Sequence, residues 1–554
     1  METAKEFPPP ARTEEGADGA KAVSPEHIAV HIVRSPQEVT EFLTAIHVHE
    51  ISEVSFSKLT GIFTLLSLPV TVLCEERYED EVYRDTYYAY FARKFSRFDR
   101  DCKRLSFFEG VLKPEAFCDY GAAAENLLRE RFRGVFVFKP TRYGEIGRTF
   151  LAPEKLRLPT CYLRTASFSF FVLGHRLSLE CFPYSSQDTE TMTCAEITIW
   201  SIMEYFGTAF SGFRTALPSQ ITAELEKHSY ERALPSRGSE YSWMSAIFKT
   251  FGFAPRLYDR RAFADDEKQR REFKKLFHYY VESGIPVAVG IRGKKRGEEL
   301  RHSVVCIGHG ARKRQIQAPE VCYMGNETVY PYIDSAFLYE SYVLMDDNQA
   351  PYQVASLGNL DGWAVSEVNT FVAPLYPQVF LEAGDVSALI SAVFTDDCMG
   401  IAGLVPEFGE RVDQNNPLIL RVFLAQSGEY QGFRAKNAET LGTAAFYGSL
   451  RLPPYVWAAE ISTYAAYQSG KIYGEIVIDA TAGRSDQLDS LIMIRYLDHL
   501  GFRTPEESPV YAIDKGLKCR TRGLRFPYAM YRNNLTECGG RKTNGNVSDT
   551  RTGT

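Results

Sequence analysis

The chain has 554 residues, of which 45% are hydrophobic and 24% charged, and it carries a formal net charge of −7. This length exceeds what one hydrophobic core organises and predicts about three domains. The acidic balance disfavours nucleic-acid binding, which needs a basic surface for the phosphates. Eleven cysteines without a CxxC pair favour neither a disulfide framework nor a structural zinc site, so we expect free thiols and a cytoplasmic location.

The N-terminal part predicts a tail followed by a mixed domain. Residues 1–24 are polar and rich in Pro, Gly and Ala, which indicates disorder, and they lack the apolar segment of a secretory signal. Residues 25–158 combine helix and strand patterns and are expected to form an α+β domain. Ser35 and Pro36 are typical of a helix start, and residues 134–138 predict a strand. No segment has the apolar length of a membrane span.

The most informative segment begins at Thr193, within a predicted domain of residues 159–355. Thr193 and Glu196 have the spacing of a capping box, which places Cys194 at the first helical position. Apolar residues cover most of the helix circumference up to Gly207, the expected C-cap, so we expect a buried helix. Free backbone amides and the helix dipole favour a thiolate at such a position. A buried structural cysteine is the alternative interpretation.

Two strands after this helix bring a histidine to the end of a predicted sheet. The first, Val287–Arg292, is followed by polar residues 293–301, which are expected to form a loop. His302 then begins a second apolar strand over residues 302–308. His309, beyond that strand, is expected in a loop.

A third strand supplies an acid for this histidine. Residues 341–345 are apolar and are followed directly by Asp346. If the second and third strands pair antiparallel, His302 and Asp346 share one end of the sheet, where the carboxylate would fix the imidazole tautomer. Asp346 is favoured because it ends the apolar run, while Asp347 and Asn348 remain open as the third residue.

Gln187 lies upstream of the cysteine and is a candidate oxyanion donor. Its side-chain amide could act together with the backbone N–H of Cys194. An exposed loop glutamine is an equally good interpretation of the spacing alone.

The C-terminal part carries no motif with a chemical mechanism. Residues 356–536 are expected to form an α/β region, with a strand over 472–479 and a helix over 487–500. Residues 537–554 are rich in Asn, Gly, Thr and Arg and predict a second disordered tail.

Five pieces in this order resemble the C39-like cysteine peptidases, a branch of the papain-like superfamily, over about a third of the chain. They are Gln187, Cys194, Gly284-Ile-Pro-Val287, His302-Ser-Val-Val-Cys-Ile-Gly308 and Asp346. The chain differs from the family pattern in having Ala195 after the cysteine, where glycine is usual. The chain as a whole resembles large bacterial proteins that join such a domain to flanking regions.

The resemblance implies an α+β fold in which a central helix packs on an antiparallel sheet. It also implies a peptidase or amide hydrolase that acts on a peptide or protein through a thioester acyl-enzyme. Cys194, His302, Asp346 and Gln187 would be its site residues, with no cofactor, metal, nucleic acid or membrane involved. The flanking regions could bind a partner protein.

Other functions stay open at this level. A deamidase or acyltransferase would use the same residues, and a catalytically inactive papain-like scaffold or binding protein would keep only the fold. An N-terminal acyltransferase rests on no more than the strand at 135–138 and the turn at 144–147.

Overall fold

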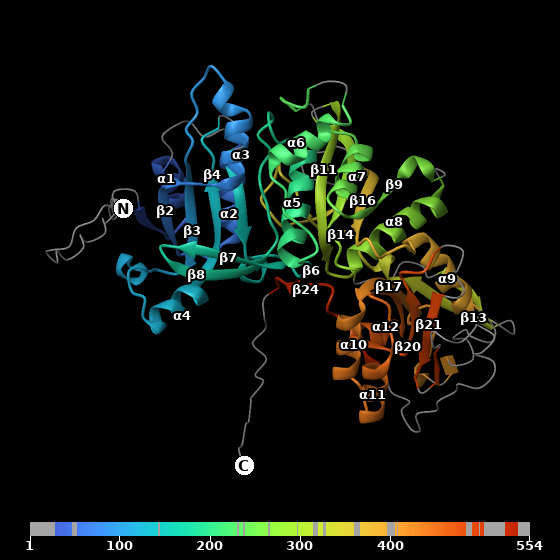
Figure 1. The fold of residues 1–554 in the computed structure, drawn as a ribbon. Coiled ribbons are helices and arrows are strands. Elements are labelled where there is room, and N and C mark those ends of the chain that lie inside the picture. The colour runs from blue at the N-terminus through green and yellow to red at the C-terminus, as the bar shows by residue number, and fades with distance from the viewer. Residues whose placement is uncertain are drawn as a thin grey trace, which may run out of the picture.

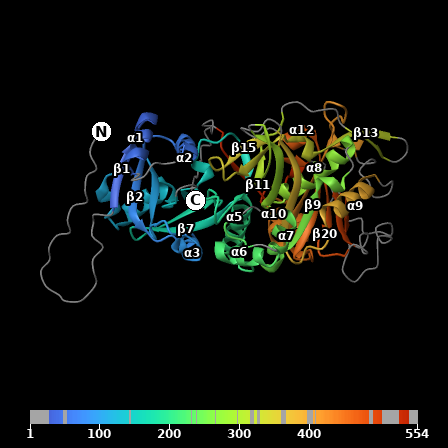
Figure 2. The same cartoon turned by 90° about the horizontal axis from the view of Figure 1, so that it is seen from above.

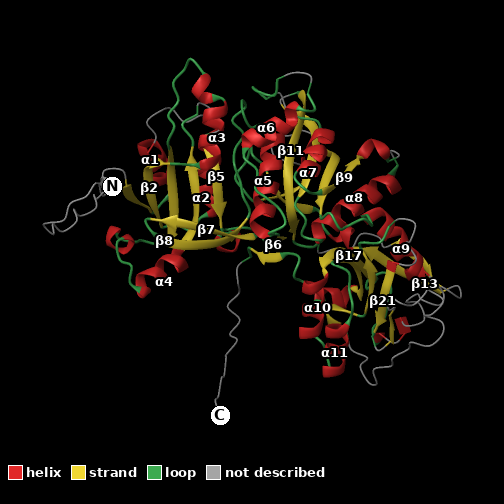
Figure 3. Ribbon diagram, in the orientation of Figure 1, coloured by secondary structure: helices red, strands yellow, loops and turns green. Residues whose placement is uncertain are grey.

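The computed structural model describes the chain over residues 28–46, 53–141, 145–229, 232–236, 239–263, 266–295, 297–313, 320–324, 328–358, 366–395, 405–406, 408–483, 490–497, 499–502 and 527–540. The protein has the predicted α+β class, and its strands form three large, mainly antiparallel sheets (Figure 1, Figure 3). None of the described helices is long and apolar enough to cross a membrane. The predicted tail of residues 1–24 lies outside the described residues.

The N-terminal sheet is a five-stranded antiparallel meander in the order β1-β2-β3-β4-β5. Pro36 opens α1, and the Ser35 hydroxyl accepts from the Glu38 backbone N–H at 3.3 Å, which confirms the predicted helix start. The predicted strand around residues 134–138 is confirmed as β4. The elements are β1 (Ile28–Val33), α1 (Pro36–Ile46), α2 (Glu53–Leu65), β2 (Val70–Tyr78), α3 (Glu81–Ala89), β3 (Cys102–Glu109), α4 (Ala122–Arg131), β4 (Phe132–Phe138) and β5 (Ile146–Leu151).

The middle sheet has the order β15-β14-β11-β10-β16-β9, and β6 joins both β11 and β24. The helix that starts at Cys194, α5, lies between this sheet and the N-terminal sheet (Figure 2). The elements are β6 (Cys161–Leu163), α5 (Cys194–Ala209), α6 (Pro218–Glu226), α7 (Tyr241–Thr250), β9 (Ala254–Asp259), α8 (Glu267–Glu282), β10 (Val287–Lys295), β11 (Glu298–Gly310), β14 (Ser341–Met345), β15 (Gln353–Ser356), β16 (Ser366–Leu375) and β24 (Thr536–Cys538). The hairpin of β7 (Ala166–Val172) and β8 (His175–Cys181) precedes α5.

Both faces of the middle sheet are buried, because alternate side chains of its strands enter two different cores. Val305 and Ile307 of β11 belong to the core shared with α5, whereas Val304 and Cys306 belong to the core shared with α8. This alternation follows from the two-residue period of a strand. It explains why residues 304–307 are continuously apolar.

The C-terminal sheet has the order β12-β13-β17-β18-β20-β21-β22, in which β13 and β17 run parallel and the other neighbours antiparallel. It lies at the lower right of Figure 1. The elements are β12 (Glu320–Met324), β13 (Thr328–Asp334), α9 (Ala383–Thr395), β17 (Leu418–Gln426), α10 (Ser427–Lys436), α11 (Leu441–Ser449), β18 (Tyr455–Thr463), α12 (Tyr464–Gln468), β20 (Gly474–Asp479), β21 (Leu491–Tyr496) and β22 (His499–Phe502); β19 (Lys471–Ile472) pairs with β23 (Tyr528–Ala529).

The predicted boundary at residue 355 does not separate these two sheets. β13 precedes it and joins the C-terminal sheet, whereas β16 follows it and lies between β10 and β9 of the middle sheet. The predicted tail that starts at residue 537 begins too early, because β24 pairs with β6. Hydrophobic periodicity predicts that a strand exists but not which strand is its partner.

Four local predictions were wrong. Residues 293–295 and 298–301 form the arms of a hairpin instead of a loop, since Arg292 pairs with Arg301 and Lys295 with Glu298. His309 lies within β11 and is buried. Gly207 does not cap α5, which runs on to Ala209; a Cβ at this position would lie 2.3 Å from the backbone nitrogen of Thr215, so glycine allows the next segment to approach.

The fourth wrong prediction is the helix over residues 487–500. In the described part of this range, β21 pairs antiparallel with β20, and β22 continues the sheet. The apolar run Leu491–Ile494 is compatible with the period of a helix and with that of a strand. The short length of the run and the neighbouring strand β20 favour the strand.

Candidate active site

Cys194 is the first residue of α5, and its helix start is fixed by Glu196. The Glu196 carboxylate accepts from the Thr193 backbone N–H at 2.9 Å and from the Thr193 hydroxyl. Ser236 and Ser239 donate to its other oxygen, each at 3.0 Å. Helix α5 is buried on most sides, as predicted, whereas Cys194 itself is only partly buried.

Replacing Glu196 by alanine is expected to lower the free energy of unfolding by about 1–2 kcal/mol, the cost of losing a helix cap. The partly buried donors of Thr193, Ser236 and Ser239 would lose the acceptor that they share, the buried Glu196 carboxylate. Urea-induced unfolding measures this change. Glu226→Ala, on the exposed last turn of α6, is the control, and an equal effect of both substitutions would contradict the assigned role.

His302 lies between Cys194 and Asp346. Its Nε2 is 2.8 Å from Oδ1 of Asp346, and its ring also forms a side-chain hydrogen bond with the Cys194 thiol. β11 and β14 pair antiparallel, which is the condition on which this contact was expected, and the pairing brings the histidine and the acid together. Because Nε2 faces the carboxylate, Nδ1 is the ring nitrogen left for the thiol.

The electrostatics of the buried pair favour a charged imidazolium. Burial alone would lower the pKa of His302, but the Asp346 carboxylate and the hydrogen bonds to Asp346 and Cys194 raise it well above its ordinary value. Burial opposes ionisation of Asp346 as well, yet His302 and the backbone N–H of Asn348 hold its pKa below the usual range. The two groups therefore stabilise each other as an ion pair.

Asp347 and Asn348, the two alternatives for the third residue, also lie beside His302. Nε2 of His302 is 3.5 Å from Oδ1 of Asp347 and 3.3 Å from Nδ2 of Asn348, so Asp346 makes the shortest contact. Burial raises the pKa of Asp347 to about 6, although His302 opposes this. Its carboxylate has no hydrogen-bond partner outside its own backbone in the described structure.

Gln187 belongs to the same group of side chains. Its amide nitrogen donates to Oδ1 of Asn348 at 2.9 Å, and the residue is partly buried. One N–H bond of the amide fixes this orientation, and the second is available for a ligand. The structure thus brings all four predicted site residues together.

Sequence reasoning missed Lys58, which reaches the site from α2 of the N-terminal part. Its ammonium donates to the backbone carbonyl of Asp347 at 2.7 Å and to the Ser186 hydroxyl at 3.0 Å. Burial lowers the pKa of Lys58, while Asp347 opposes the shift. A signal existed, because Lys58 shares its helical stripe with buried Leu59 and Ile62.

Three side chains of the candidate site form a cluster that could hold a cation. Ligand atoms of His302, Asp346 and Asp347 lie within 4.8 Å of one another. A metal ion there would have to displace the His302–Asp346 hydrogen bond and would sit close to the charge of Lys58. The donor set therefore fits a protonated histidine between carboxylates better than a metal ion.

No protein-family model matches the chain. No curated protein matches it either. The geometry of the site is therefore the basis for a proposed function.

Proposed function

We propose that the protein is a cysteine amide hydrolase with a papain-like, C39-like catalytic domain, in which Cys194, His302 and Asp346 form the triad. One observation carries the proposal: the His302 ring lies between the thiol at the start of α5 and a buried carboxylate. A thiolate beside an imidazolium, at the positive end of a helix, is the activated nucleophile of such enzymes.

The proposed reaction has two halves. The Cys194 thiolate attacks an amide carbonyl, and the oxyanion is held by the backbone N–H of Cys194 and the amide of Gln187. His302 gives its proton to the leaving nitrogen, so the C–N bond breaks and a thioester forms. His302 then takes a proton from water, which attacks the thioester and releases the carboxylic acid and the thiolate. Asp346 keeps the imidazole oriented throughout.

The proposed substrate is a peptide or protein in the cytoplasm. Deamidation follows the same first half-reaction when the leaving nitrogen is ammonia, and acyl transfer follows it when an amine replaces water. These variants differ only in the leaving group or in the acceptor of the acyl group.

A peptide library incubated with the full chain tests the proposal. We expect new peptide N-termini, or ammonia where a side-chain amide is the substrate, together with an acyl adduct on Cys194 after an acid quench. Both should be lost in Cys194→Ala and kept in Cys118→Ala, because Cys118 is an exposed thiol outside the site. Formation of the same products by Cys194→Ala would overturn the proposal. So would the absence of an acyl adduct on Cys194 together with a Cys194 thiol that is no more reactive than that of Cys118.

A further inference from the structure

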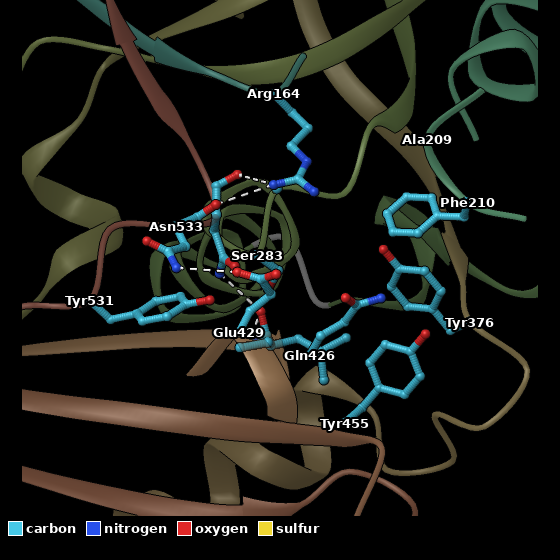
Figure 4. Close-up of a pocket in the computed structure, with 14 residues that line it drawn as sticks. Arg164, Ala209, Phe210, Ser283, Tyr376, Gln426, Glu429, Tyr455, Tyr531 and Asn533 are labelled. Carbon is cyan, nitrogen blue, oxygen red and sulfur yellow. Dashed lines mark hydrogen bonds between the residues drawn. The ribbon is translucent and has the colours of Figure 1, made fainter. Parts of the chain in front are cut away.

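A cavity of about 390 Å³ lies between the middle and C-terminal sheets, at the opposite end of α5 from Cys194. Ala209 and Phe210, at the end of that helix, form part of its wall, and Figure 4 shows the side chains that surround it. Its volume is within the range of small-molecule sites. It shares no lining residue with the Cys194 site.

Arg164 is the cation of this cavity. Its Nε donates to the Tyr205 hydroxyl at 2.7 Å, and Nη1 donates to the backbone carbonyls of Asn533 and Asn534 at 3.2 and 3.1 Å. Among the described residues, no carboxylate lies within ion-pair distance of this guanidinium. A partly buried guanidinium that has no carboxylate partner among the described residues attracts an anionic group.

Glu429 supplies an opposite charge in the same cavity. It belongs to the first turn of α10, and its Oε2 accepts from Nδ2 of Asn533 at 3.4 Å. Figure 4 shows the Glu429 carboxylate and the Tyr531 ring on the side of the cavity away from Phe210. Arg164 and Glu429 both line the cavity and do not form an ion pair with each other.

Aromatic rings form the remaining wall. Tyr376 stacks on Tyr455 with ring centroids 4.5 Å apart, and Phe210 meets Tyr376 edge-on at 5.5 Å. In Figure 4 these three rings follow one another along one side of the cavity. Such a surface fits an apolar or aromatic group at low entropic cost.

We propose that this cavity binds a free α-amino acid with an apolar or aromatic side chain. Arg164 would take the carboxylate, Glu429 the ammonium group, and the rings of Phe210, Tyr376 and Tyr455 the side chain. Neither the Arg164 guanidinium nor the Glu429 carboxylate has a strong partner of the opposite charge within the cavity, so a zwitterion would pair with both. Because the ligand would contact the last turn of α5, it would bind away from Cys194, and the proposal is independent of the catalytic one.

Isothermal titration of the full chain with L-phenylalanine tests this proposal. We expect saturable binding of L-phenylalanine. The dissociation constant should be about tenfold or more higher for N-acetyl-L-phenylalanine, which lacks the ammonium group, and for phenethylamine, which lacks the carboxylate. Glu429→Gln should weaken the binding of L-phenylalanine about tenfold and leave the binding of N-acetyl-L-phenylalanine unchanged. Glu429 is exposed, so this variant is expected to fold.

Glu226→Gln on α6 is the matched control and should bind as the unmodified chain does. Absence of saturable binding of L-phenylalanine would overturn the proposal. Equal binding of the zwitterion and its two singly charged analogues, or an unchanged dissociation constant in Glu429→Gln, would overturn it too.

Discussion

Replacing His302 by alanine is expected to slow the alkylation of Cys194 by iodoacetamide at pH 6 about 100-fold. At this pH an ordinary thiol, with a pKa of about 8.5, is ionised to less than about 1%. Asp346 raises the pKa of His302, so the imidazole stays protonated, and the imidazolium that is hydrogen-bonded to Cys194 provides the positive charge that stabilises a thiolate. The rate is measured by mass spectrometry of the alkylated peptides.

Two internal controls make this experiment specific. Cys118 is exposed in the same chain and reports the reactivity of an ordinary thiol. His228→Ala removes an exposed histidine just after α6 and should leave Cys194 unchanged. His302→Gln retains more of the side-chain volume and should slow Cys194 as alanine does. If Cys194 reacts at its original rate in both His302 variants, the two residues do not function as a pair.

Asp346→Asn and Asp347→Asn are expected to change stability in opposite directions at pH 8. Asp346 forms an ion pair with buried His302, and removal of one partner from such a pair costs about 3–5 kcal/mol. Asp347 is buried without a hydrogen-bond partner outside its own backbone, so its ionised form destabilises the folded state. Loss of that charge should therefore raise the free energy of unfolding.

The dependence on pH has a definite sign for each residue. Burial raises the pKa of Asp347 to about 6, above its ordinary 3.8, so the folded chain binds more protons between these values and stability falls as the pH rises. Asp347→Asn should thus be neutral near pH 4 and stabilising by about 2–3 kcal/mol at pH 8. The pKa of Asp346 is lowered instead, so its contribution is present above its ordinary pKa and lost as the pH falls through the folded value.

Urea-induced unfolding at pH 4 and pH 8, followed by tryptophan fluorescence, to which buried Trp200 in α5 and buried Trp457 in β18 contribute, measures both effects. Destabilisation by Asp347→Asn at pH 8 would contradict the account of that carboxylate. An unchanged stability of Asp346→Asn at the same pH would show that its ion pair with His302 contributes little to the fold.

Local signals in the sequence predicted the start of the site well. The capping box of Thr193 and Glu196 involves residues three apart, and the apolar pattern of α5 extends over several turns, so both can be read from one short segment. The contact of His302 with Asp346 could also be inferred on the condition that their two apolar strands, β11 and β14, pair antiparallel, although β12 and β13 lie between them in the chain.

Contacts between distant segments could not be predicted in the same way. Lys58 and the carbonyl of Asp347 are 289 positions apart, and the insertion of β16 between β10 and β9 depends on the packing of two sheets. The hairpin at residues 293–301 was missed for another reason. Its exposed arms carry charged side chains, which resemble a loop when the partner strand is unknown.

The pH profile of Cys194 alkylation in the unmodified chain tests the central claim most directly. If Cys194 and His302 form an activated pair, Cys194 already reacts at pH 6 at close to its rate at pH 8, while Cys118 accelerates steeply over the same interval. A Cys194 profile that rises in parallel with that of Cys118 would contradict the assignment of Cys194 and His302 as an activated nucleophile and its base.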